Sequence, residues 1–75
     1  MDFSEALTNL KAGVRMQRKG WNGRGMFVAA QFPDERSKMT LPYLYLKTVK
    51  NEFVPWVASH TDLFSDDWEV IFDDR

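Results

Sequence analysis

The fold of this chain is decided by Leu41-Pro42-Tyr43-Leu44-Tyr45-Leu46-Lys47-Thr48. Successive side chains of a strand point to opposite faces of a sheet, so Leu44 and Leu46 share one face. The two tyrosines and Lys47 then occupy the other face. This alternation predicts a half-buried strand, and Pro42 fits an edge or the beginning of that strand.

Further strand patterns flank this stretch on both sides. Residues 49–52 suit a tight hairpin connection, and residues 33–40 read as a polar loop because they are rich in charged and turn-forming side chains. Residues 14–18 alternate apolar and basic side chains, as a half-buried strand does, whereas residues 26–32 are more apolar. The expected strands are 14–18, 26–32, 41–48, 53–57 and 68–72.

A short helix is expected at residues 3–12, ahead of all the strands. Asp2 can cap it with Glu5 as reciprocal partner, and Gly13 suits the left-handed position that ends a helix. A second helical turn is expected at 59–65, capped by Ser59 or Thr61. The fold class is therefore α+β: one domain over residues 1–75, with a short N-terminal helix packed on an antiparallel β-sheet meander of roughly five strands.

The size of the chain limits its core. At 75 residues, only about 60% of the unfolded surface can be buried, so stability is marginal without a supporting device. There is no cysteine, and the single His60 cannot build a zinc site alone, so we expect no disulfide, metal or cofactor. Association into a homo-oligomer is the device that remains.

The net charge of −1 provides no polycation for duplex DNA, so we expect no duplex nucleic acid as partner. Residues 15–24 carry four bases and no acid, and residues 61–75 carry six acids and one base. The basic strip either meets phosphates or is a solvated face, and both readings stay open. No run approaches the roughly 18 apolar residues of a membrane span, and the N-terminus has no signal-peptide pattern. We therefore expect a cytosolic protein with no membrane partner.

All three tryptophans lie in polar, turn-rich sequence, and the first follows Gly20 in a glycine-rich loop. Trp21 offers a stacking face for a nucleobase, worth about 1–3 kcal/mol, and Asn22 offers both a donor and an acceptor. The loop glycines allow a ligand to approach the backbone. The alternative is a hairpin turn whose tryptophan folds back onto the core.

Trp56 follows Pro55 and precedes Ser59, Thr61 and Asp62. These hydroxyls and this carboxylate are near enough in sequence to surround a small polar ligand. The alternative role of Asp62 is to cap the short helical turn. Trp68, by contrast, begins an alternating strand, and we predict that it belongs to the core.

Catalysis has little support in this sequence. Asp66 and Asp67 are adjacent, so on a strand they point to opposite faces and cannot share one substrate bond. His60 has no nucleophile partner in the sequence, and no serine lies in a nucleophile elbow. We expect a protein that is not an enzyme and has no catalytic residues.

Several blocks of the chain resemble the Thoeris anti-defense 2 family of small phage-encoded proteins. The resemblance runs nearly end to end, leaving out residues 29–40 and the acidic tail. Four blocks carry it: Met1-Asp2-Phe3-Ser4-Glu5-Ala6-Leu7, then Arg18-Lys19-Gly20-Trp21-Asn22-Gly23-Arg24-Gly25-Met26, then Pro42-Tyr43-Leu44-Tyr45-Leu46-Lys47-Thr48, and lastly Val54-Pro55-Trp56 through Ser59, Thr61, Asp62 and Leu63 to Asp67-Trp68-Glu69.

This resemblance implies a molecular sponge that acts in the cytoplasm of the infected bacterial host. Family members bind cyclic ADP-ribose isomers made by TIR-domain immune proteins and starve the effector of its signal without cleaving the ligand. They form homotetramers with an N-terminal helix and an antiparallel sheet, and their ligand pockets lie between protomers. Some members also bind cyclic oligonucleotides of another defence system, CBASS, in a separate pocket.

The matching blocks carry the candidate ligand-binding residues. Trp21 or Trp56 would stack on adenine, and Asp62 and Asn22 would read ribose or base edges. Arg18 and Arg24 are the candidates for binding the pyrophosphate. The full set is Arg18, Trp21, Asn22, Arg24, Trp56, Ser59, Thr61 and Asp62. Residues 29–40 form a shorter segment than in longer members, which implies a different choice of ligand, or loss of binding, if that segment shapes the pocket.

Two other functions stay open on the sequence. One is a protein-interaction module that covers a host protein with its aromatic face. The other is a binder of single-stranded nucleic acid that uses aromatic stacking, which the net charge of −1 disfavours.

Overall fold

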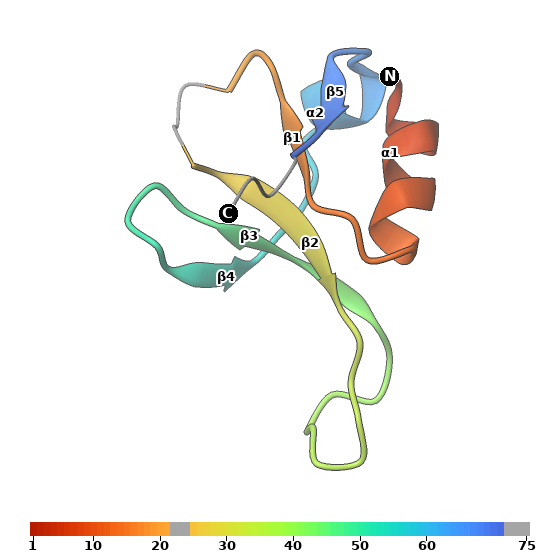
Figure 1. Cartoon of the computed structure of the whole chain (residues 1–75), viewed down its shortest axis with the longest axis vertical. Helices are drawn as coiled ribbons and strands as arrows, with labels where there is room; N and C mark the ends of the chain where they lie inside the picture. The colour runs from red at the N-terminus through yellow and green to blue at the C-terminus, as the bar shows by residue number, and fades with distance from the viewer. Residues whose placement is uncertain (22–24, 72–75) are drawn as a thin grey trace.

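The computed structural model describes residues 1–21 and 25–71, and these residues form two helices and one five-stranded antiparallel sheet (Figure 1). This confirms the α+β class. The elements are α1 (Phe3–Lys11), β1 (Met16–Arg18), β2 (Phe27–Gln31), β3 (Tyr43–Lys47), β4 (Phe53–Pro55), α2 (His60–Phe64) and β5 (Trp68–Val70). Each corresponds to an expected element and is shorter than expected at one end or at both. The expected end at Phe72 lies outside the described residues.

The strands lie in the order β4-β3-β2-β1-β5. The first four form the expected meander, but β5 does not continue it beside β4. The chain instead returns through α2 and pairs β5 with β1, which places Arg18 opposite Trp68 and Met16 opposite Val70. This return brings Asp62 and Asp67 against Arg18 at the end of β1.

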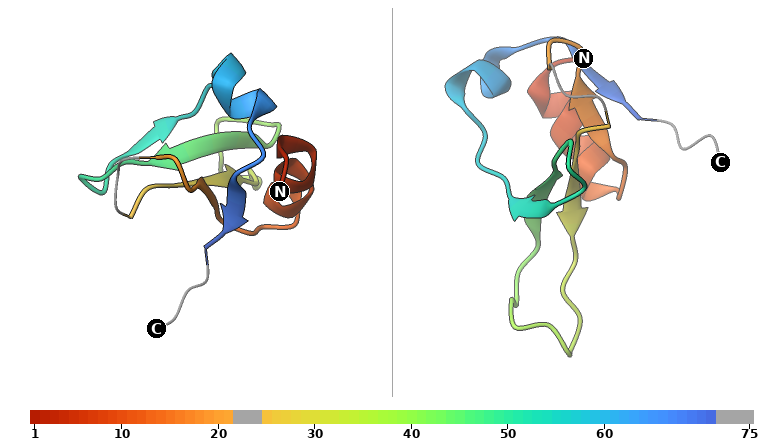
Figure 2. Two further views of the ribbon diagram at one scale, coloured as in Figure 1. Left: turned by 90° about the horizontal axis from the view of Figure 1, so that it is seen from above. Right: turned by 90° about the vertical axis from the view of Figure 1, so that its left-hand side faces the viewer.

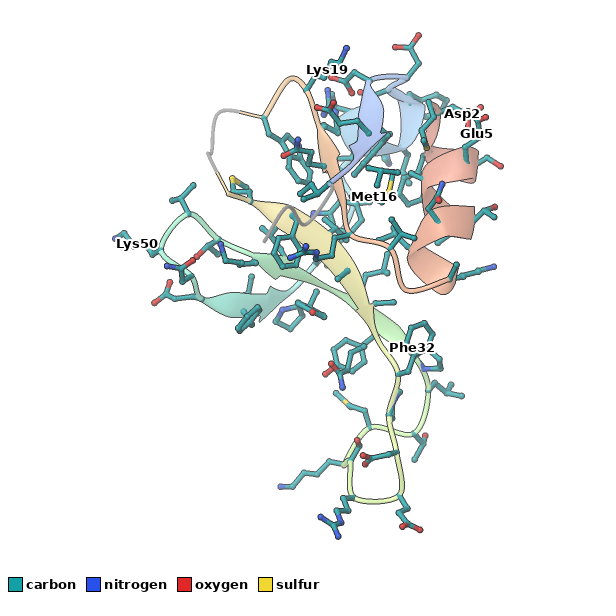
Figure 3. All side chains as sticks on the ribbon, in the orientation of Figure 1. Asp2, Glu5, Met16, Lys19, Phe32 and Lys50 are labelled. Carbon is teal, nitrogen blue, oxygen red and sulfur yellow. The ribbon has the colours of Figure 1, made fainter. Side chains whose placement is uncertain are left out.

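Helix α1 begins as the capping box predicts. The Glu5 backbone N–H donates to the Asp2 carboxylate at 2.9 Å, and Glu5 accepts from the Asp2 backbone N–H at 3.1 Å. Both residues lie at the N-terminal end of α1 (Figure 3). The helix ends before Gly13, whose φ of 91° is the left-handed conformation that glycine adopts without a Cβ clash. Its buried stripe contains Ala6 and Leu10.

The core lies between α1 and one face of the sheet, where Met16 is fully buried (Figure 3). Leu44 and Leu46 pack against it from β3, as their shared face predicts. The buried core cluster is small: Ala6, Leu10, Met16, Val28 and Trp68. A core of this size leaves the domain dependent on every large side chain in it.

The connection between β2 and β3 projects beyond the sheet as an arm of residues 32–42 (Figures 1 and 2). Its tip is organised by Asp34, whose carboxylate accepts from the Arg36 backbone N–H and the Ser37 hydroxyl at 2.9 and 3.2 Å. Along its sides, Phe32 and Leu41 are 49% and 75% exposed. The arm therefore contributes surface rather than core.

Candidate functional site

The return of β5 builds an ion-pair cluster at the end of the sheet. The Arg18 guanidinium donates from Nε to Asp67 Oδ1 at 2.8 Å and from Nη1 to Asp62 Oδ1 at 2.9 Å. The Arg18 side chain is 15% exposed, and both carboxylates raise its pKa through hydrogen bonds, led by Asp67. Arg18 is thus held charged between two acids, one from α2 and one from the segment before β5.

Asp62 has an intramolecular partner on each carboxylate oxygen. Oδ1 accepts from Arg18, and Oδ2 accepts the Ser59 backbone N–H at 3.1 Å within the capping box of α2. Burial raises the pKa of this carboxyl, but hydrogen bonds from Ser59, Arg18 and the Trp21 side chain outweigh burial and lower it below 3.8. The structure therefore settles Ser59 as the cap and assigns Asp62 the capping role that the sequence left open.

Asp67 binds the three residues that lead into Trp21. Its Oδ2 accepts the Gly20 backbone N–H at 3.0 Å, and its backbone carbonyl accepts the Lys19 N–H at 3.1 Å. The hydrogen bond from Arg18 lowers the pKa of the Asp67 carboxyl, supported by the Gly20 N–H. Both carboxyls of the cluster are thus ionised at neutral pH, a state suited to ion pairing rather than to proton donation.

The three tryptophans form one cluster, with Trp68 at its centre. Its ring is 2% exposed, and the Trp21 and Trp56 rings meet it edge-on with centroids 5.5 and 5.9 Å away. Its indole N–H donates to the Asp62 carbonyl at 2.9 Å. The prediction that Trp68 belongs to the core is confirmed. Trp21 and Trp56 are only half-buried, so each is anchored on the core while part of it remains accessible.

The structure brings most of the predicted ligand-binding residues together. Arg18, Trp21, Trp56, Ser59 and Asp62 surround Trp68 and the start of α2. Their proposed contacts with a ligand stay predictions, and the same holds for Thr61, which is exposed on α2. Asn22 and Arg24 lie outside the described residues.

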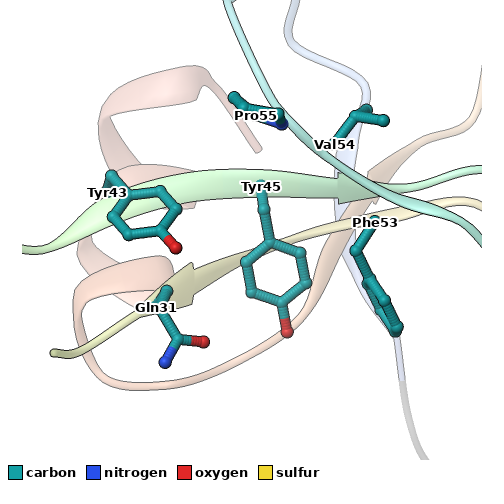
Figure 4. A pocket seen from close by; sticks show the side chains of 6 residues that line it. All are labelled: Gln31, Tyr43, Tyr45, Phe53, Val54 and Pro55. Carbon is teal, nitrogen blue, oxygen red and sulfur yellow. The ribbon is translucent and has the colours of Figure 1, made fainter. Parts of the chain in front are cut away.

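A hollow on the other face of the sheet was missed by the sequence reasoning. It is an open depression of about 360 Å³ on the side of the strands away from α1 (Figure 4). Six residues line it: Gln31, Tyr43, Tyr45, Phe53, Val54 and Pro55. The Tyr45 and Phe53 rings meet edge-on at 5.5 Å, and Phe53 is 66% exposed. The alternation in residues 43–47 did predict a second, aromatic face, and the register of β4 on β3 was the missing information.

These features define a small α+β domain with a tryptophan-centred cluster on one face and an uncovered aromatic depression on the other. A family model described as the Thoeris anti-defense 2-like domain matches residues 1–71. The chain is also 32% identical, over an alignment of 84 residues, to a Bacillus phage SP01 protein named Thoeris anti-defense 2. That alignment covers 95% of this chain and 94% of the phage protein.

The chain belongs to the Thoeris anti-defense 2 family, and its role is in phage anti-defence. This confirms the resemblance drawn from the four sequence blocks. Within the described part of the chain, no helix is both long and apolar enough to cross a membrane.

Proposed function

We propose that this chain binds and sequesters cyclic ADP-ribose isomers, and so blocks effector activation without cleaving the ligand. The observation that carries the proposal is the tryptophan cluster. Trp21 and Trp56 are braced edge-on against Trp68, and an aromatic ring held in this way can stack on adenine at a low cost in conformational entropy. Ser59 and Thr61 are exposed beside it and add hydroxyl groups.

The electrostatics of the cluster favour binding over turnover. Hydrogen bonds to Arg18 and neighbouring groups lower the pKa values of Asp62 and Asp67, so neither is poised as a general acid at neutral pH. A sponge needs affinity and no chemistry, which a rigid site with fixed charges provides. Since its ligand would be made inside the infected cell, we place its action in the host cytoplasm.

The test is calorimetric titration of the chain with a panel of cyclic ADP-ribose isomers and cyclic oligonucleotides, followed by heat denaturation and analysis of the released ligand. Release of intact ligand is expected, and a cleaved product would support an enzyme instead. Replacing either Trp21 or Trp56 with alanine should weaken binding roughly 5- to 150-fold, which corresponds to losing one stacked base. Phe64→Ala is the matched control, because that aromatic ring is 89% exposed on α2.

We further propose that the chain acts as a homo-oligomer, with the tetramer as the expected state. Its buried core cluster is small, so association would bury apolar surface that a single chain leaves exposed. The aromatic depression is the surface that such an interface would cover, since Phe53 and Tyr43 are 66% and 39% exposed there.

Light scattering and sedimentation of two matched variants test this interface. Phe53→Ser should shift the oligomer toward smaller species, whereas Phe64→Ser should leave it unchanged, because both rings are exposed but only Phe53 lines the depression. An oligomer that withstands Phe53→Ser, or an unmodified chain that sediments as a monomer, would contradict the proposal.

A second candidate function is a protein-interaction module that inhibits a host protein through its aromatic face. The aromatic depression favours this function, because aromatic side chains are enriched at protein interfaces. Pull-down from host lysate distinguishes the two functions. Capture of one stoichiometric host protein that Phe53→Ser abolishes, with no small molecule retained, would support this module and refute the sponge.

A further inference from the structure

Asp67 connects the ion-pair cluster to Trp21 through consecutive backbone and side-chain contacts. Its carboxylate holds the Arg18 guanidinium at 2.8 Å and the Gly20 N–H at 3.0 Å, and its carbonyl holds the Lys19 N–H at 3.1 Å. The Trp21 N–H then closes a turn onto the Arg18 carbonyl at 3.1 Å. Every residue from 18 to 20 is therefore fixed by Asp67 immediately before the chain reaches Trp21.

The far side of Trp21 is fixed as well. Its ring meets Trp68 edge-on at an interplanar angle of 77°, and Trp68 directly follows Asp67 in sequence. There is little room for a side chain at position 20, because a Cβ there would lie 3.1 Å from Asp67 Oδ2 and 3.5 Å from Arg18 Nη2. The carboxylate thus lies in tight contact with the place that a methyl group at position 20 would take.

We propose that Asp67 is the positioning residue for Trp21: by binding residues 18–20 it fixes the backbone from which the indole ring reaches Trp68, and through the place of the ring it sets ligand affinity. The effect on affinity rests on the proposed sponge function, whereas the effect on the ring does not. Asp67 itself touches no ligand in this scheme. Its side chain is 29% exposed and is engaged with Arg18 and Gly20.

The test compares Asp67→Asn with Asp66→Asn, which removes a neighbouring exposed carboxyl. Three quantities are measured: thermal stability, the near-ultraviolet circular dichroism of the tryptophan pair, and affinity for cyclic ADP-ribose isomers as probes. The contribution of Trp21 is the part of the spectrum that Trp21→Phe removes. Asp67→Asn should lose that part and bind about tenfold more weakly, because an amide cannot serve both partners of the carboxylate. Asp66→Asn should leave all three quantities unchanged.

Gly20→Ala provides an independent perturbation that keeps all charges of the cluster. Its Cβ would lie 3.1 Å from Asp67 Oδ2, so the carboxylate must shift by a few tenths of an ångström, and the variant should show the spectral change and the weaker binding in the same direction even if Asp67→Asn fails to fold. The proposal is overturned if the folded variants at positions 20 and 67 keep the Trp21 signal, or lose it and still bind within twofold of the unmodified chain. If the unmodified chain binds no probe, the sponge function fails, and the spectrum alone decides whether Asp67 positions Trp21.

Discussion

Replacing Trp68 with phenylalanine should cost this domain a large share of its stability. The indole is 2% exposed, and its N–H donates to the Asp62 carbonyl at 2.9 Å. Leaving that buried carbonyl unpaired costs about 1–3 kcal/mol. The loss of two ring carbons adds about 1.5 kcal/mol, at about 0.8 kcal/mol for each buried CH₂-sized group. The expected loss is therefore about 2.5–4.5 kcal/mol.

This loss is large compared with the free energy of unfolding of a small domain. A chain of 75 residues has a free energy of unfolding of about 4–11 kcal/mol, so Trp68→Phe removes about a quarter of it or more. At about 4–8 °C for each kcal/mol, the melting temperature should fall by roughly 10–35 °C. Thermal unfolding followed by far-ultraviolet circular dichroism measures the shift. Phe64→Ala is the control and should change stability by less than about 0.5 kcal/mol, because that ring is 89% exposed.

One result would refute the division of labour among the tryptophans. If Trp68→Phe melted within a few degrees of the unmodified chain but no longer bound cyclic ADP-ribose isomers, Trp68 would be a ligand wall. The edge-on contacts of Trp21 and Trp56 with Trp68 would then serve to shape the ligand site and would add little to the stability of the core.

Three further predictions concern acid, the helix cap and the core. Because its folded pKa is lowered, Asp62 contributes stability that is fully present above the unfolded value of 3.8 and is lost as pH falls through the folded value; acid titration of unfolding should show this loss, and Asp62→Asn should make it less steep. Asp2→Ala should cost about 0.5–2 kcal/mol in chemical denaturation, since it removes the capping box of α1. Leu10→Ala should cost about 2–5 kcal/mol, whereas Leu41→Ala, which changes a side chain that is 75% exposed, should be close to neutral by the same assay.

Local sequence patterns predicted the elements of this fold well, because each depends on neighbours in the chain. The cap at Asp2, the break at Gly13 and the hairpin at residues 49–52 all follow from short-range rules, and Asn51 takes the positive φ of 64° that such a turn needs. The return of β5 to β1 was not predicted. It depends on pairing between strands about 50 residues apart, which no periodicity encodes.

For the candidate site, the sequence likewise predicted residue types but not the contacts between them. The charge asymmetry between residues 15–24 and 61–75 was visible, but its consequence was not, namely that Arg18 would be paired with Asp62 and Asp67. The residue types near Trp21 and Trp56 indicate a ligand by their chemistry alone. They do not reveal that the two rings share one support in Trp68, because that contact exists only once β5 lies beside β1.

The tryptophan cluster couples the stability of this domain to the function proposed for it. Trp68 is part of the small buried core, and the same ring braces the two rings that would hold the ligand. A ligand stacked on Trp21 or Trp56 would bind only the folded chain, and at a concentration 100-fold above its dissociation constant it would add about 2.7 kcal/mol to the free energy of unfolding. For a domain of this size that is a substantial fraction of the total. On the proposed function, a marginal core and a ligand site therefore suit each other in this fold: a bound ligand would supply stability that the small core lacks, and its release would require giving that stability up.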